Sequence, residues 1–209
     1  RASPDWSQVM TRLLQRAVRG QPLPGDSFLA QYRFHDHQFG CDVVKIMPGE
    51  FFVSSGHIAL ATVLGSCVSA CLWDPVTKVG GMNHFMLADG GGRANSMRYG
   101  QFAMDTLLQH LLAAGALAHS IEAKVFGGAR VMRGLTHSEV GSDNVRFALD
   151  YLQEQDIPVI ASDLGDVCPR KLYFFPESGR VKLRRLRSDE STRVIREEQE
   201  YRQRIIHEA

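Results

Sequence analysis

The sequence has little cysteine, no long apolar run and almost no net charge, and each absence excludes a class of protein. Four cysteines in 209 residues are too few for a disulfide-stapled secreted scaffold, and a chain of this length can bury a core without disulfides. We therefore interpret all four as reduced thiols: Cys41, Cys67, Cys71 and Cys168. No run of about 18 apolar residues indicates a membrane span, and the first residues lack the apolar core of a signal peptide. We expect a cytoplasmic protein with no membrane insertion.

Charge and glycine patterns exclude two further classes of partner. The formal net charge is +1, from 24 basic and 23 acidic residues, so no overall field favours nucleic acid. The glycine-rich segments at 90–93 and 127–130 match neither G-x-x-x-x-G-K-[ST] nor G-x-G-x-x-G. Neither a nucleic-acid partner nor a bound nucleotide is therefore expected.

A metal site is a sharper alternative, because three cysteines and a histidine could supply four ligands: Cys67, Cys71, His84 and Cys168. The chain contains no Cys-x-x-Cys or His-x-x-x-His pair, and positions 67 and 71 of one strand would lie about 13 Å apart. No metal site is predicted, and the cysteines other than Cys67 are interpreted as structural or incidental thiols.

The centre of the chain has the pattern of a β-rich module followed by helices. Short runs rich in Val, Phe and Ile fill residues 42–87 and alternate with the turn signals PG, SG, DP and GG. Helical patterns cover 97–115 and, after the segment AKVFGG, a stretch from Ser142 or Asp143 to Gln155. The strands IPVIAS, KLYFF and RVKLRRL follow. These elements form one predicted domain, residues 42–187.

Two extensions flank this domain. Residues 1–41 contain a predicted amphipathic helix over 5–19 and a linker or surface arm over 21–40. Residues 188–209 alternate Glu and Arg along a predicted helix with few apolar positions. We interpret this tail as a solvated helix. The alternative hypothesis is that it docks through four apolar residues: Val194, Ile195, Ile205 and Ile206.

The segment with the clearest chemical potential is Thr62-Val-Leu-Gly-Ser-Cys67, followed by His84 within GGMNHFM. A cysteine directly after a Gly-Ser pair lies where a strand meets a turn, and backbone N–H groups there can serve as an oxyanion hole. A thiol with a pKa of about 8.5 needs a nearby base to become a good nucleophile, and His84 is the candidate. A chain reversal at Asp74-Pro75 would place the two on neighbouring strands. The spacing equally permits a buried structural cysteine and a hydrogen-bonded structural histidine.

An ordered set of motifs runs along the domain. It comprises LGSCV at 64–68, Asp74-Pro75, GGMNHFML at 80–87, KVFGGA at 124–129, Asn144-Val145, Asp163-Leu164-Gly165, Arg170-Lys171 and FFPESGRV at 174–181. Over residues 42–187 this set resembles the CheD family of bacterial chemoreceptor glutamine deamidases. The resemblance implies an α+β fold with a central mixed β-sheet or β-sandwich core and helices packed outside it.

The resemblance also implies roles for individual residues. Cys67 is the nucleophile and His84 the general base and acid. Thr62 orients His84 through its hydroxyl, although Ala61 could occupy that place in the family pattern. Three residues are assigned to binding the substrate and the oxyanion: Gly65, Ser66 and Asn83. No metal ion or organic cofactor is required.

The implied activity is that of a protein-glutamine glutaminase, which converts selected glutamines in the cytoplasmic helices of methyl-accepting chemoreceptors to glutamate through a thioester on Cys67. The same site could hydrolyse a glutamate methyl ester. A CheC-type phosphatase is the implied second partner. Two alternatives stay open: a non-catalytic adaptor that binds receptors or that phosphatase, and another cysteine acyl-transfer enzyme.

The sequence departs from the family pattern in one loop. Family members usually carry glycines where this chain has Asp166 and Pro169. Because proline fixes φ and removes an N–H donor, we expect this loop to differ in shape or in its contacts.

Overall fold

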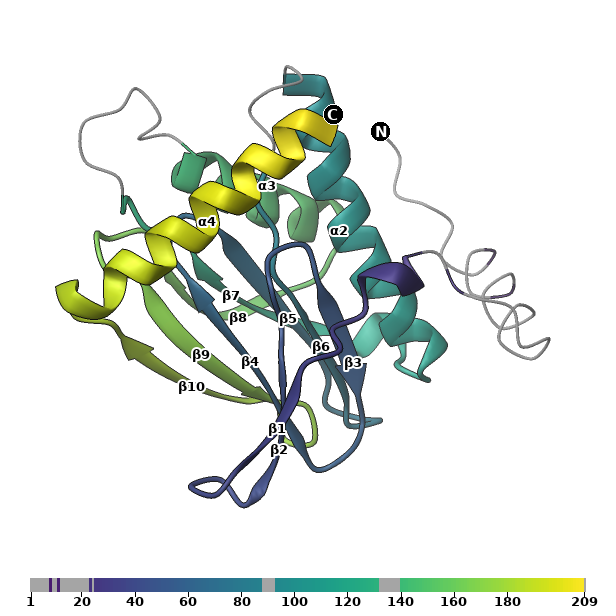
Figure 1. Ribbon diagram of the computed structural model, residues 1–209. Coiled ribbons are helices and arrows are strands. Elements are labelled where there is room, and N and C mark those ends of the chain that lie inside the picture. Colours follow the sequence, from purple (N-terminus) through teal and green to yellow (C-terminus); the bar gives the residue numbers. More distant parts are fainter. Residues whose placement is uncertain are drawn as a thin grey trace.

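A computed structural model describes residues 8, 11, 23, 25–87, 93–131 and 140–208. Within these residues the chain forms two five-stranded sheets stacked face to face, with α-helices outside them (Figure 1). The predicted α+β fold with a β-sandwich core is therefore confirmed. The predicted helix over 5–19 lies outside the described residues except for Gln8 and Thr11, and both of these are helical.

The first sheet has the strand order β1-β2-β4-β9-β10, and β2 and β4 are its parallel pair. Its strands are β1 (Arg33–Asp36), β2 (Cys41–Lys45), β4 (Ile58–Leu64), β9 (Arg170–Phe175) and β10 (Arg180–Arg185). The segment 21–40, interpreted from the sequence as a linker or a surface arm, contains β1 and the short 3-10 helix Asp26–Phe28, so it is not a linker there. An edge strand that is exposed along most of its length has no alternation of apolar and polar residues, so its sequence resembles a loop.

The second sheet has the order β3-β6-β5-β7-β8, and β7 and β8 are its parallel pair. Its strands are β3 (Phe51–Ser54), β6 (Val79–Asn83), β5 (Val68–Asp74), β7 (Glu122–Gly127) and β8 (Val159–Leu164). β5 and β6 form the hairpin that the sequence predicts at Asp74-Pro75. The Asp74 carboxylate accepts hydrogen bonds from the Val76 N–H at 2.8 Å and the Thr77 hydroxyl at 2.7 Å, which fixes the reversal.

Beyond the sheets, the described ranges from residue 25 onward contain the α-helices α2, α3 and α4. α2 (Arg93–Ala113) and α3 (Val140–Glu154) pack on the outer face of the second sheet, and the predicted helices at 97–115 and 142–155 are thereby confirmed with earlier starts. The buried residues of α2 recur at helical spacing: Met104, Leu107, Leu108 and Leu111. α4 (Ser188–Glu208), yellow in Figure 1, crosses one end of the sandwich. A short 3-10 helix, Ala118–Ser120, precedes β7.

The alternation of side chains across β5 separates two cores. Val68, Ala70 and Leu72 face α2 and α3, whereas Cys71 faces the first sheet and packs in the layer between the sheets. That middle layer also contains Leu60 and Leu64 of β4 together with Cys67. The stretch before β5 therefore buries its cysteine between the two sheets, which is where the candidate site lies.

Gly127 gives a test of the packing around this cysteine. Its φ is 114°, and a Cβ there would overlap the carbonyl oxygen of Cys67. Gly115 has a similar φ of 103° but open space around it, so Gly115→Ala measures backbone strain alone, about 1–3 kcal/mol of unfolding free energy. We expect Gly127→Ala to lose about 2 kcal/mol more than Gly115→Ala in urea unfolding. Equal losses would contradict the close approach.

Candidate active site

Cys67 lies in the connection that leads from β4 of the first sheet to β5 of the second. Its side chain is fully buried. The backbone of the connection is held by the turn after β7, because the Gly128 N–H donates to the Cys67 carbonyl at 2.8 Å and the Ala129 N–H donates to the Gly65 carbonyl at 2.7 Å. The N–H groups of Gly65, Ser66 and Cys67 all point to one spot, where they meet the same side chain.

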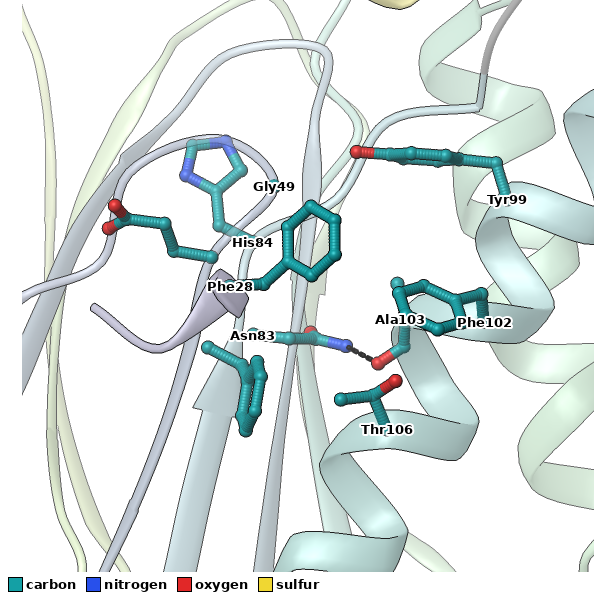
Figure 2. Close-up of a pocket in the computed structure, with 10 residues that line it drawn as sticks. Phe28, Gly49, Asn83, His84, Tyr99, Phe102, Ala103 and Thr106 are labelled. Atoms are coloured by element: carbon teal, nitrogen blue, oxygen red, sulfur yellow. Dashed lines mark hydrogen bonds between the residues drawn. The ribbon is translucent and has the colours of Figure 1, made fainter. Parts of the chain in front are cut away.

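His84 follows the last residue of β6, at the same end of the hairpin as Cys67. Val68 and Phe85 exchange backbone hydrogen bonds of 3.0 and 2.9 Å, and each of them directly follows one of the two candidate residues. The predicted juxtaposition of Cys67 and His84 is thus present. Figure 2 shows His84 above a pocket whose far wall is α2, with Tyr99 and Phe102 on that wall.

Thr62 sets the tautomer of His84. The Thr62 hydroxyl lies 2.8 Å from His84 Nδ1 and donates its single proton to the Ile46 carbonyl at 2.8 Å. Nδ1 must therefore carry the proton and donate to the Thr62 oxygen. The other ring nitrogen, Nε2, is left with its lone pair, and among the described residues it has no hydrogen-bond partner. This is the form in which an imidazole can accept a proton.

Burial dominates the protonation of both groups. It lowers the pKa of His84 to about 4, against a partial opposing effect of the Glu198 charge. Burial, and after it the Glu198 charge, raises the pKa of the Cys67 thiol well above its usual value. In this arrangement a neutral thiol faces a neutral imidazole.

Glu198 of α4 fills the spot to which the three N–H groups point. Oε1 accepts from the N–H of Gly65 at 2.8 Å and of Cys67 at 3.1 Å. Oε2 accepts from the Ser66 N–H at 2.7 Å and the Ser66 hydroxyl at 2.8 Å. The carboxylate is 1% exposed. Its four accepted hydrogen bonds equal the capacity of an ionised carboxylate.

The seating of Glu198 corrects the interpretation of the tail as a solvated helix. Val194 and Tyr201 flank Glu198 on the same face of α4, and all three are buried. The sequence signal was present as an i, i+4, i+7 stripe, but it consists of one aliphatic, one acidic and one aromatic residue in a highly charged segment. Val194, named in the docking hypothesis, is buried against the body of the protein, near Thr62 and His84. Ile195 is partly buried, and the side chains of Ile205 and Ile206 lie outside the described residues.

The cluster is also the one group of potential metal ligands among the described residues. One ligand atom from each of Cys67, His84 and Glu198 lies within 4.8 Å of the other two. Both carboxylate oxygens accept hydrogen bonds from N–H and O–H donors, however, and a cation at this place would compete with those donors for the same lone pairs. Cys71 and Cys168, the other ligands considered from the sequence, are not part of the cluster.

Of the three predicted binding residues, Gly65 and Ser66 meet the carboxylate and Asn83 does not. The Asn83 amide oxygen accepts from the Ala70 N–H at 2.9 Å, and its nitrogen donates to the Ala103 carbonyl at 3.4 Å (Figure 2). Its polar side-chain atoms therefore join β5 and α2. Strand alternation turns Asn83 to the helix side of the sheet, where it lines the pocket beside His84, and its role in substrate binding stays a prediction.

Sequence reasoning noted Asn144 as part of a motif but gave it no role. Its side chain, fully buried, accepts from the Leu87 N–H at 2.8 Å and donates to the Ser66 carbonyl at 2.8 Å. It thus ties the Ser66 peptide to the segment after His84. A polar residue at an inward position of an amphipathic helix was the available signal.

The loop between β8 and β9, where the sequence departs from the family pattern, supports the site from behind. The buried Arg170 guanidinium donates to the carbonyls of Gly127 at 2.8 Å and Asp163 at 2.6 Å. Asp166 adopts a φ of 68° and pairs with Arg185 at 3.0 Å, while the Pro169 carbonyl accepts from the Leu186 N–H at 2.7 Å. The loop is therefore fixed through charged and carbonyl partners.

Comparison with known proteins shows that this chain belongs to one family. The family model CheD, chemotactic sensory transduction, matches residues 86–185. Probable chemoreceptor glutamine deamidase CheD 1 of Shewanella oneidensis is 50% identical over 178 residues, which cover 83% of this chain and 86% of the relative. The CheD relative from Thiobacillus denitrificans, named likewise, is 47% identical over 182 residues, 85% of this chain and 90% of its own. Because each of these matches covers more than four fifths of the chain, positions 67 and 84 both lie within the matched region.

Among solved structures, the Bacillus licheniformis hypothetical protein YfiH aligns with 76% of this chain and 68% of its own, at 12% identity and a TM-score of 0.35. No helix in the described part of the chain has both the length and the apolar character needed to cross a bilayer.

The protonation of His84 is directly measurable. We expect its NMR signals to stay those of the neutral Nδ1–H tautomer from pH 8 to about pH 5, because burial lowers its pKa to about 4. Since the unfolded state binds this proton near pH 6.5, stability contributed by His84 is present above pH 6.5 and lost as pH falls toward 4, by roughly 3 kcal/mol. His84→Gln should remove that component from the pH dependence of urea unfolding. A midpoint near 6.5 in the NMR titration would refute the buried, neutral state.

Proposed function

Because the chain belongs to the CheD family, we propose that it is a cytoplasmic chemoreceptor glutamine deamidase that uses Cys67 as its nucleophile. The observation that carries the proposal is the convergence of three N–H donors on a carboxylate beside the Cys67 thiol and His84. A site that holds a carboxylate in this way can also hold the oxyanion formed when a thiolate attacks a carboxamide.

The proposed reaction has two halves. His84 Nε2 takes the proton from the Cys67 thiol, and the thiolate attacks the carboxamide carbon of a receptor glutamine. The resulting oxyanion accepts hydrogen bonds from the N–H groups of Gly65, Ser66 and Cys67. His84 then gives its proton to the departing nitrogen, ammonia leaves, and a thioester remains. Water activated by His84 hydrolyses the thioester to glutamate and restores the thiol.

Thr62 acts in this scheme as a positioning residue. Its hydroxyl fixes the Nδ1–H tautomer, which keeps Nε2 as the proton acceptor. Asn144 is the second positioning residue, because it holds the Ser66 carbonyl and with it the direction of the adjoining N–H groups. Asn83 is left out of the proposed mechanism.

The acyl chemistry extends to glutamate methyl esters, since the thioester would be the same. The proposed partners are methyl-accepting chemoreceptors as substrate and a CheC-type phosphatase as a second binding protein. A non-catalytic adaptor would not require Nε2 to be kept unprotonated beside the thiol, and this observation favours the enzyme.

The assignment of Cys67 is tested with receptor cytoplasmic fragments and mass spectrometry. We expect glutamine to become glutamate, a gain of about 1 Da per site, with Cys41→Ala as active as wild type and Cys67→Ala inactive. Cys41 is a matched control because it is a buried thiol packed on the outer side of the first sheet. Glu198→Ala is included because Glu198 occupies the N–H donors. If wild type, Cys41→Ala and Glu198→Ala all fail to convert glutamine, the deamidase assignment is contradicted. If Cys67→Ala converts glutamine, Cys67 is excluded as the nucleophile.

The role of Thr62 is tested by a pair of substitutions. Thr62→Val keeps the shape but removes the hydroxyl, so we expect kcat to fall by about 10²-fold with little change in KM. Thr62→Ser keeps the hydroxyl and should restore most of the activity. A purely structural role predicts instead that the two variants lose activity in proportion to lost stability, which urea unfolding of both would reveal.

A further inference from the structure

The three N–H donors of the candidate oxyanion hole cannot serve a substrate in the observed arrangement. Glu198 uses all of them, together with the Ser66 hydroxyl. An oxyanion formed at Cys67 would need the same donors at the same moment. The carboxylate therefore excludes catalysis as long as α4 stays seated, and it cannot be a third catalytic residue.

The protein backbone is shaped to receive this helix. A Cβ at Gly65 would stand 2.7 Å from Glu198 Oε2, and a Cβ at Gly49 would stand 2.7 Å from the Tyr201 hydroxyl, so glycine at both positions permits the approach. Tyr201 also meets Tyr99 of α2 through the two hydroxyls. α4 thus contacts both the turn that carries Cys67 and Tyr99. Figure 2 shows Tyr99 on the far wall of the pocket beside His84.

α4 also closes the approach to His84 from the first sheet. A small pocket there is lined by residues 45–48, Thr62, His84, Val194 and Glu198. One of its walls is therefore α4 itself, and without that wall the pocket would open to solvent beside His84. Outside the buried stripe, the described residues of α4 are largely exposed and charged. Arg193 and Glu197 pair at 2.8 Å within the helix, and Arg184 of β10 pairs with Glu190 of α4 at 2.8 Å.

The chemistry of the seated group matches the product of the proposed reaction. Deamidation of a glutamine leaves a glutamate side chain, with its carboxylate beside the thiol and in the oxyanion hole. Glu198 presents that side chain from an α-helix, and Val194 and Tyr201 secure the helix one turn before and after it.

We propose that α4 is an internal product mimic: it occupies the binding surface for substrate helices, lowers the activity of the enzyme through Glu198, and must leave before a receptor glutamine can enter. This inference rests on the proposed function for the identity of the substrate, but not for the occupancy of the site. Because the helix is tethered to the domain it blocks, even weak contacts keep the surface filled. The surface accordingly favours substrate helices with an apolar residue four positions before the glutamine and a large aromatic residue three positions after it.

The first experiment measures access to Cys67 in the full chain, without any substrate. Native protein is treated with iodoacetamide, and labelling of each cysteine peptide is followed by mass spectrometry. We expect Cys67 in Glu198→Ala to react at least about tenfold faster than in wild type, because the thiol is freed of its cover. Glu200→Ala, which removes an exposed charge from the same helix, should leave the rate unchanged.

Two features keep this result interpretable. Cys71 is buried in the same inter-sheet layer, so its continued protection shows that the fold is intact. Val194→Asp loosens α4 without touching Glu198 and should also speed labelling of Cys67. Equal labelling rates of Cys67 in wild type, Glu198→Ala and Val194→Asp would overturn the inference.

The second experiment turns the mimic into a substrate. In Glu198→Gln a carboxamide is placed beside the thiol, and the proposed chemistry should convert it with one water to glutamate and ammonia. The peptide that contains position 198 should therefore gain about 1 Da with time, while Gln199 and Gln203 in the same helix keep their amides. The added substitution Cys67→Ala should abolish the gain. Persistence of the amide at 198 in an enzyme that converts receptor glutamines would overturn the product-mimic geometry.

The receptor assay separates this inference from the proposed function. Faster labelling of Cys67 in Glu198→Ala, together with at least about tenfold faster conversion of receptor glutamines, supports both. Faster labelling with no conversion of any receptor glutamine contradicts the proposed function and leaves α4 as the cover of a differently used site. Unchanged labelling contradicts the inference even if receptors are deamidated.

Discussion

The arrangement of the site depends on one constraint: three consecutive backbone N–H groups, of Gly65, Ser66 and Cys67, are turned toward one buried point and need an acceptor there. Buried N–H groups without a partner are strongly unfavourable. The carbonyls of this connection are taken by Gly128, Ala129 and Asn144, which fixes the peptide planes and leaves the donors pointing inward. Something with several acceptor lone pairs must meet them, and in this structure it is a carboxylate.

The two sheets contribute different parts of the site. Thr62 comes from the first sheet, His84 follows a strand of the second, and Cys67 lies on the segment that crosses from one sheet to the other. The hydrogen bond between Thr62 and His84 therefore spans the sandwich. Relative movement of the sheets would separate these groups, so close packing of the middle layer is a condition for the alignment of the proposed nucleophile and base.

Hydrophobic periodicity in the sequence predicted the two helices that became α2 and α3. The reversal at Asp74-Pro75 predicted that Cys67 and His84 lie on neighbouring strands, close to each other. The Thr62 contact came from family resemblance, since spacing alone does not state which neighbouring strand lies across the sandwich. Glu198 was missed because the stripe of Val194, Glu198 and Tyr201 has an acid at its centre, and an acid in a highly charged segment does not indicate burial. The assignment of Asn83 to substrate binding came from its place beside the histidine in the family motif, and strand alternation directs its amide to α2.

The favourable and unfavourable free-energy terms for seating α4 are of similar size, which is why a helix can serve there as a removable cover. Desolvation of a carboxylate costs several kcal/mol, and charge-assisted hydrogen bonds from Gly65, Ser66 and Cys67 offset a comparable amount. The buried stripe adds apolar contact through Val194 and Tyr201, worth about 2 kcal/mol for each side chain that is fully buried. Ordering the tail opposes this gain. The net preference for the seated state is then a small difference. A receptor helix that makes the same contacts and brings a carboxamide to the thiol can compete with α4. Its apparent Kd is the intrinsic Kd divided by the fraction of molecules in which α4 is unseated.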